Sequence, residues 1–254
     1  MSGHSKWAQI RRAKGVNDAR RGQLFTRLGR EIVVAVREGG GGDPNANFRL
    51  RLAIQRARDA NMPLDNIERT IKRALGGTEG ASLEEITYEG YGPSGTAMMV
   101  QTLTENRNRT VAEVRNAFNR NAGNLGENGC VDWLFEAKGI IEVELQGHDP
   151  DELSLEAIDL GADDVDPVGP EDEVLTIYTD AADLEKIRQA LEAKKYKVVK
   201  SESTMLPKTK IEISDEKVAH QLMRLVERLE DLDDVQNVYT NADFPEEFAA
   251  SYEG

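Results

Sequence analysis

The spacing of apolar residues changes near residue 78, and this change constrains the fold more than any other feature of the sequence. Before it, apolar residues recur at intervals of three and four, which is the period of an amphipathic helix. Beyond it, short runs rich in β-branched and aromatic residues alternate with helical patterns, which indicates strands and helices in turn. The sequence therefore predicts an α+β protein, with an N-terminal helical domain over residues 1–78 followed by two α/β domains.

Three helices are expected in the first domain. The apolar side of the first, near residues 17–36, consists of Leu24, Phe25, Leu28, Ile32 and Val36. The glycine-rich stretch REGGGGDPN then ends this helix. The core residues of the second helix, near residues 46–60, are expected to be Leu50, Ala53, Ile54 and Ala57. The third begins near Pro63, a favoured first-turn residue, and ends at Gly76 and Gly77.

The remaining chain predicts two α/β domains of ferredoxin-like type, the first of them discontinuous. A strand pair surrounds the turn at residues 92–95, and a helix follows that a capping box of Thr110 and Glu113 would open. Residues 136–204 then follow the order βαββαβ of a split βαβ unit. The strand, helix and strand after Pro207 are too few for another domain, so we expect them to return to the sheet begun at residue 86. The middle domain is thus residues 79–135 plus 205–245, and residues 136–204 are inserted.

Charge is distributed unevenly along the 254 residues, whose formal net charge is -14. Residues 1–75 carry a net charge of +9, and residues 76–254 carry -23. A basic block on an acidic chain indicates a local surface for a polyanion, although a solvated helix face is the plainer interpretation. On the first helix, a basic stripe is expected to face solvent, opposite the apolar side: Arg20, Arg27, Arg30 and Arg37.

Catalytic signatures do not emerge from the sequence. Three histidines lie far apart and outside metal-binding spacings, and neither GxSxG nor a phosphate loop is present. Runs of acids such as LEDLDDV are expected to be solvated surface. The single cysteine, Cys130, excludes a disulfide framework and is expected to be a buried or half-buried structural residue in a cytoplasmic protein. We therefore expect no enzyme, cofactor, metal, small-molecule substrate or membrane partner.

Two basic clusters favour nucleic acid as the partner. In the first, four cations surround Trp7, so that ionic contacts could combine with stacking on a base: Lys6, Arg11, Arg12 and Lys14. In the second, the residues Asn106 to Arg109 precede the helix whose N-terminus would also favour phosphate. The alternative for Trp7 is an anchor that packs on the helical domain.

Several long blocks, in order over residues 3–135, resemble the YebC/PmpR family: GHSKW, RGQLFTRLGREI, NMPLDNIERTIKRALGG, YEGYGPSG, LTENRNRTVAEVRNAF and AGNLGENGCVDW. The resemblance implies a non-enzymatic regulator of gene expression, described first for DNA-binding transcriptional regulators. Other members look like ribosome-associated translation factors that assist particular nascent sequences, which would make rRNA the partner. A protein-binding adaptor, whose acidic domains contact basic proteins, is a further alternative. The nucleic-acid-binding residues expected on these matching stretches are Lys6, Trp7, Arg11, Arg12, Lys14, Arg20, Arg27, Arg30, Arg107 and Arg109.

Overall fold

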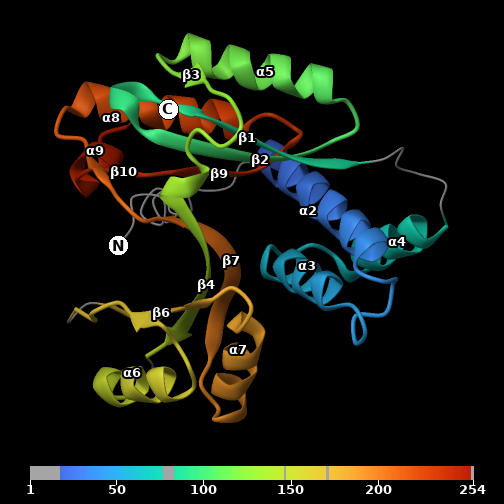
Figure 1. The fold of residues 1–254 in the computed structure, drawn as a ribbon. Helices are drawn as coiled ribbons and strands as arrows, with labels where there is room; N and C mark the ends of the chain where they lie inside the picture. The colour runs from blue at the N-terminus through green and yellow to red at the C-terminus, as the bar shows by residue number, and fades with distance from the viewer. Residues whose placement is uncertain (1–17, 77–82, 146, 170–171, 253–254) are drawn as a thin grey trace. The chain divides into compact units, whose positions relative to one another are not determined.

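The computed structural model describes residues 18–76, 83–145, 147–169 and 172–252, and the chain divides into two compact units (Figure 1). One unit is the continuous segment 135–206. The other contains the chain before residue 135 and after residue 206, so the N-terminal helices and the discontinuous sheet belong to the same unit. The expectation from sequence placed the inserted segment at residues 136–204 and separated the helices as a third domain.

Three helices form the N-terminal part of the larger, discontinuous unit: α2 (Asp18–Glu38), α3 (Phe48–Asp59) and α4 (Leu64–Leu75). The Asn47 side chain caps α3 by accepting a hydrogen bond from the backbone N–H of Leu50, at 3.0 Å. The four residues expected as the core of α3 are all buried in the cluster that the three helices share. On α2 the prediction was wrong at Leu24, which is 37% exposed; Phe25 packs against the shared core, and the first buried residue of that core on α2 is Leu28.

The discontinuous sheet has the strand order β3-β1-β2-β9. Its strands are β1 (Glu84–Tyr91), β2 (Ala97–Thr104), β3 (Asn124–Leu125) and β9 (Val235–Thr240). A short 3-10 turn, Pro93–Gly95, connects β1 to its antiparallel neighbour β2, and Ser94 and Gly95 adopt positive φ there. Strand β9 pairs with β2, so the chain after residue 207 does return to the sheet begun near residue 84.

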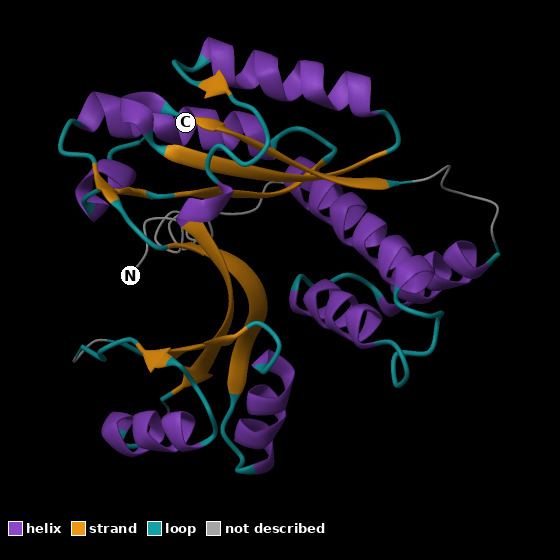
Figure 2. Ribbon diagram, in the orientation of Figure 1, coloured by secondary structure: helices purple, strands orange, loops and turns teal. Residues whose placement is uncertain are grey.

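Helices α5 (Arg107–Arg120) and α8 (Glu216–Glu230) lie along this sheet and share its hydrophobic core (Figure 2). The capping-box prediction for α5 was wrong: the helix begins at Arg107, and Asn106 is its N-cap. The hydroxyl of Thr110 instead lies within hydrogen-bond distance of Thr104 Oγ1 and Asp234 Oδ2, so Thr110 does not act as the N-cap.

The segment after residue 207 departs from the sequence prediction in one element. Of the strand expected near residues 208–214, only β8 (Ile211–Glu212) forms, and it pairs in parallel with β10 (Ala242–Asp243) rather than with the main sheet. Helix α9 (Glu246–Ala250) then packs against α8. Of the two strands expected from this segment, only β9 therefore belongs to the main sheet.

The inserted unit contains two helices on a sheet of order β5-β6-β4-β7. Strands β4 and β5 are both antiparallel to β6, so they are parallel to each other with β6 between them. This is the split βαβ arrangement of a ferredoxin-like fold. The core between sheet and helices includes Ile141 and Ile177 from the strands and Ile187 from the second helix. The elements are β4 (Phe135–Glu144), α6 (Pro150–Asp159), β5 (Asp164–Val165), β6 (Val174–Asp180), α7 (Leu184–Ala193) and β7 (Val198–Pro207).

Candidate nucleic-acid interface

The predicted nucleic-acid-binding residues fall into two groups. Five of them lie outside the described residues: Lys6, Trp7, Arg11, Arg12 and Lys14. Arg20 lies on α2, but its side chain is not described. The structure therefore bears on Arg27, Arg30, Arg107 and Arg109.

The basic stripe predicted on α2 faces solvent at Arg37, but not at Arg27 and Arg30. Arg27 and Arg30 are both half-buried, and the side chain of Arg30 retains 26% of its exposure. One turn further on, Val34 is 2% exposed although it does not belong to the core of the three helices. The side of α2 between Arg27 and Val34 is therefore covered, and Arg30 finds its hydrogen-bond partners on another part of the same unit.

Asp234, immediately before β9, is the residue on which one arginine of the predicted α2 stripe and one arginine of the second basic cluster meet. Its carboxylate is 2% exposed, which corrects the expectation that LEDLDDV is solvated surface. Arg30 Nη1 donates to Asp234 Oδ1 at 2.9 Å and to the carbonyl oxygen of Asp233 at 2.7 Å. Arg109 Nη2 donates to Asp234 Oδ2 at 2.7 Å. Side chains from α2 and α5, far apart in the sequence, thus converge on one carboxylate.

Two hydroxyl groups complete the environment of Asp234. Thr110 Oγ1 donates to Oδ2 at 2.8 Å, and Thr104 Oγ1 lies 3.1 Å from the same oxygen. Burial of the carboxylate acts to raise its pKa, but the hydrogen bonds from Arg109, Thr110 and Thr104 outweigh burial and lower the pKa of Asp234 below its ordinary value. The group therefore stays ionised at neutral pH and retains its hold on both guanidinium groups.

The first turn of α5 presents the other basic residues. The Asn106 side chain accepts a hydrogen bond from the backbone N–H of Arg109, at 3.1 Å. Arg107 is exposed, and the side chain of Arg109 remains 50% exposed despite its ion pair. Because the N-terminus of a helix carries partial positive charge, these arginines reinforce a location that already favours anions. The structure thus places Arg107 within the helix, not in the loop before it.

Part of the positive charge of the helical segment is neutralised locally. Arg56 pairs with Glu31 at 2.7 Å, and Arg49 pairs with Glu38 at 2.7 Å and also with Glu85. These pairs do not exhaust the cations, since residues 18–75 contain 12 basic and 7 acidic residues. A net positive charge of +5 therefore remains on the described helical segment.

A second buried carboxylate, Glu89 on β1, organises the loop that contains Cys130. Glu89 is 6% exposed and accepts hydrogen bonds from the backbone N–H groups of Gly129, Val131 and Asp132, at 2.7–2.8 Å. Burial and the nearby Glu89 charge raise the pKa of the Cys130 thiol. The half-buried cysteine is therefore held as a thiol, which fits the structural role expected from the sequence.

Sequence reasoning missed the burial of Asp234 and of Glu89. Asp234 is one of four acids within the run LEDLDDV, and Glu89 is an isolated acid in a strand. Neither position carries a local pattern that indicates burial. The alternation of β1 puts Glu89 on the same face as Glu85 and Thr87, opposite Ile86 and Tyr88, so the strand pattern favoured an exposed side chain.

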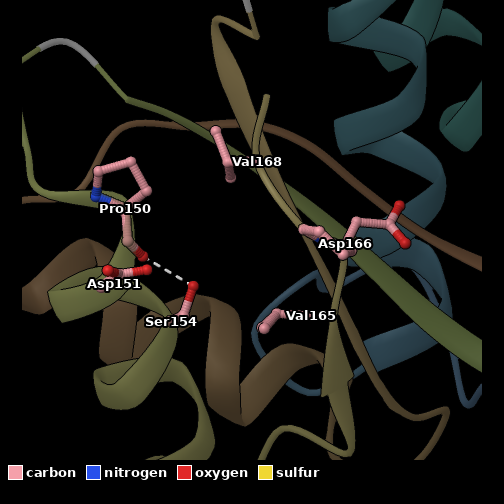
Figure 3. A pocket seen from close by; sticks show the side chains of 7 residues that line it. Pro150, Asp151, Ser154, Val165, Asp166 and Val168 are labelled. Atoms are coloured by element: carbon pink, nitrogen blue, oxygen red, sulfur yellow. Dashed lines mark hydrogen bonds between the residues drawn. The ribbon is translucent and has the colours of Figure 1, made fainter. Parts of the chain in front are cut away.

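A pocket of about 420 Å³ in the inserted unit is the other candidate site (Figure 3). It is lined by α6 residues Asp151 and Ser154 and by the segment 165–168. The Ser154 hydroxyl donates to the carbonyl oxygen of Pro150 at 2.7 Å, so it is already engaged within the helix. The described lining includes two carboxylates and no basic residue, so the pocket does not suit an anionic ligand.

Metal-binding clusters and membrane-spanning helices are both missing from the described ranges. Within them, no group of three or more histidine, cysteine or acidic side chains is placed to hold a metal ion. Over the same part of the chain, no helix has the length and apolar character needed to cross a membrane.

Comparison with known families covers nearly the whole chain. Residues 5–77 match the TACO1/YebC protein N-terminal domain, and residues 83–242 match the TACO1/YebC second and third domain. The chain belongs to the TACO1/YebC family. This confirms the resemblance to YebC proteins seen in the sequence blocks.

Relatives of this TACO1/YebC chain extend over its full length. A protein of Chloroflexus aurantiacus is 57% identical over 255 residues, covering 100% of both chains. One from Moorella thermoacetica is 54% identical over 246 residues, covering 96% of both. Each of these relatives is named a probable transcriptional regulatory protein.

The TACO1/YebC fold has also been observed in a crystal. The chain is similar to a conserved hypothetical protein from Aquifex aeolicus, with a TM-score of 0.79 and 47% sequence identity. The similarity covers 90% of this chain and 92% of the other. The α+β architecture is therefore shared with a solved structure.

Proposed function

We propose that this TACO1/YebC protein is a non-enzymatic, DNA-binding regulator of transcription. The observation that carries the proposal is the meeting of α2 and the first turn of α5 at Asp234 within one compact unit. A long polyanion needs several cationic contacts on one surface, because each neutralised phosphate adds to affinity by releasing counterions. Two basic loci that are distant in sequence but joined in the fold meet that requirement.

The distribution of charge supports the same proposal. Residues 1–75 carry +9, whereas the inserted unit, residues 135–206, contains 7 basic and 19 acidic residues. A polyanion is attracted to the first segment and repelled by the second. The acidic unit is therefore suited to contacts with basic proteins or to limiting how nucleic acid lies on the molecule.

The choice of DNA rests on the relatives. Contacts with phosphate groups supply affinity without identifying the polymer, so the arginines alone do not separate DNA from RNA. Relatives more than half identical are named as transcriptional regulators, which favours duplex DNA. Binding to rRNA in the ribosome, as a translation factor, is the competing outcome of the experiment below.

The non-enzymatic part of the proposal rests on the chemistry of the interface. Its described polar groups are guanidinium, amide, hydroxyl and a carboxylate that is occupied by four donor groups. The cysteine thiol, the strongest nucleophile available, has a raised pKa. These groups are suited to holding phosphate and lack an activated nucleophile paired with a base.

A salt titration tests the proposal. The affinity of the full chain for a duplex DNA and for a structured RNA would be measured by fluorescence anisotropy over a series of salt concentrations. For duplex DNA, the logarithm of the affinity should fall with the logarithm of salt by about 0.9 for each phosphate neutralised. Replacement of Arg107 by alanine should reduce that slope by about one.

Arg120→Ala is the matched control, because Arg120 is exposed at the opposite end of the same helix. It should leave the slope unchanged. A flat salt dependence for both polymers would contradict the proposal and favour a protein-binding adaptor. Tighter binding to RNA, together with co-sedimentation with ribosomes, would replace transcription with translation.

A further inference from the structure

We infer that Asp234 is a positioning residue, and that it holds Arg30 and Arg109 as one two-arginine site for a backbone phosphate. The inference rests on the proposed function and deepens it, because it names the chemical group bound and the acid that arranges the site. An acid is an unexpected component of an anion-binding surface. Asp234 contributes through geometry, because it holds the guanidinium groups of Arg30 and Arg109 in place. In doing so it reduces the positive charge of the site by one unit.

The three side chains joined at Asp234 carry a net positive charge, while the negative charges of Glu105 and Glu113 also act on Arg109. Two guanidinium groups and one carboxylate give a net charge of +1, and the side chains of Arg30 and Arg109 keep 26% and 50% of their exposure. Asp234 itself is 2% exposed, so it cannot meet a ligand directly. A phosphate would therefore meet the arginines and not the acid beneath them.

The hydrogen-bond donors are also sufficient. A guanidinium group has five N–H donors. The described bonds to Asp233 and Asp234 use Nη1 of Arg30 and Nη2 of Arg109. On the half-exposed Arg109 this leaves Nε, both N–H groups of Nη1 and one N–H of Nη2, so two neighbouring nitrogens can still make the planar, bidentate contact that arginine makes with phosphate.

Anchoring favours binding because it removes freedom before the ligand arrives. An unrestrained arginine side chain carries about 2 kcal/mol of rotamer entropy, part of which is lost when it grips a ligand. Here Arg109 is restrained at one nitrogen by Asp234, while Arg30 is held both by the same carboxylate and by a backbone carbonyl. Thr104 and Thr110 in turn fix the carboxylate from the β2 and α5 sides.

The decisive experiment compares two neighbouring acids. Asp234→Asn and Asp233→Asn each remove one negative charge, but only the Asp234 carboxylate binds the guanidinium groups, since Arg30 contacts Asp233 through its main-chain carbonyl. If charge alone mattered, both variants would bind duplex DNA more tightly. If Asp234 positions the arginines, Asp234→Asn should bind about tenfold more weakly, with a salt slope smaller by about one, while Asp233→Asn binds at least as tightly as wild type.

A second pair of variants applies if Asp234→Asn does not fold, as judged by circular dichroism. Arg109→Lys and Arg107→Lys both keep the positive charge. Only Arg109→Lys removes a guanidinium group that is hydrogen-bonded to Asp234. Arg109→Lys should weaken binding, and Arg107→Lys should have a much smaller effect. Equal effects in this pair would overturn the inference.

The outcomes separate the two proposals. If wild-type protein binds neither polymer, the proposed function fails, and the inference fails with it. If wild type binds but Asp234→Asn binds as tightly as Asp233→Asn, only the inference fails, and Asp234 is a structural link between α2 and the sheet.

Discussion

Residues 18–75 contain 12 basic and 7 acidic residues, whereas residues 135–206 contain 7 basic and 19 acidic residues. In the first segment carboxylates are the scarce partners, and Glu31 and Glu38 each bind an arginine. In the second segment cations are scarce, and Arg188 is shared by Glu185 and Glu192. Each segment therefore pairs part of its minority charge internally and keeps a surplus of the majority charge.

The comparison shows that ion pairs within a segment do not change the sign of its net charge. The inserted unit uses nearly all its cations in ion pairs: Lys138, Lys186, Arg188, Lys194, Lys197 and Lys200. It still carries a net charge of -12. A nucleic acid should therefore be attracted to the helical segment and repelled by the inserted unit.

The largest effect is expected from cavities in the two separate cores. Ile32 in the helical segment and Ile177 in the inserted unit are both 0% exposed. Replacement of either by alanine should lower the free energy of unfolding by about 4 kcal/mol, measured by urea denaturation. Only Ile32→Ala should also weaken DNA binding under conditions where both variants are folded, because it loosens the helix that holds Arg30. If only Ile177→Ala bound DNA more weakly, the assignment of DNA binding to the helical segment would be wrong.

A smaller loss of stability is expected from Arg30→Glu. The substitution removes an ion pair and places a second carboxylate beside the buried Asp234, so it should destabilise the protein by about 3 kcal/mol. Arg69→Glu makes the same charge change at an exposed position on α4 and should cost less than about 1 kcal/mol. Thermal unfolding compares the two, and equal losses would show that Arg30 behaves as a surface residue.

Glu89→Gln should remove about 1–2 kcal/mol of stability at neutral pH, because three backbone N–H groups lose a charged acceptor. Burial acts to raise the pKa of Glu89, but these hydrogen bonds outweigh it and lower the pKa below its ordinary value of 4.5. The carboxylate therefore contributes stability that is fully present above pH 4.5 and is lost as the pH falls through the lowered pKa. Wild type should lose stability more steeply than Glu89→Gln in that acidic window, and parallel pH profiles would contradict this assignment.

The smallest effect is expected from a partly exposed ion pair in the inserted unit. Lys138 contacts Asp163 at 2.7 Å, and Lys138→Ala should cost roughly 0.2–1 kcal/mol. The cost should shrink in concentrated salt, because salt screens charges near the surface. A cost that does not change between low and high salt would show that packing, not charge, is what Lys138 contributes.

Elements with strong local patterns were predictable from the sequence. The core of α3 was correct at every position, because the helical period alone selects one face. The order of strands and helices in the inserted unit was also predicted, since turns and changes of period separate its elements. The start of α5 was not predicted correctly, because the Thr110 hydroxyl binds the distant Asp234 carboxylate and does not cap the helix.

The candidate site was predicted in part. Arg30 and Arg109 were both chosen as binding residues, but nothing in their surroundings in the sequence indicated that they share a partner. The helical wheel assigned Arg30 to solvent, because a wheel distinguishes one apolar face and has no information about a second covering. The acid that joins the two arginines was hidden in a run that is acidic throughout.

The sequence by itself determined the types of element and the separation of charge, because both depend on the order of residues along the chain. Tertiary structure decided which of many acids is buried and which two arginines it unites. Burial of a carboxylate requires donors gathered from α2, β2 and α5, and only the folded chain brings these together around Asp234.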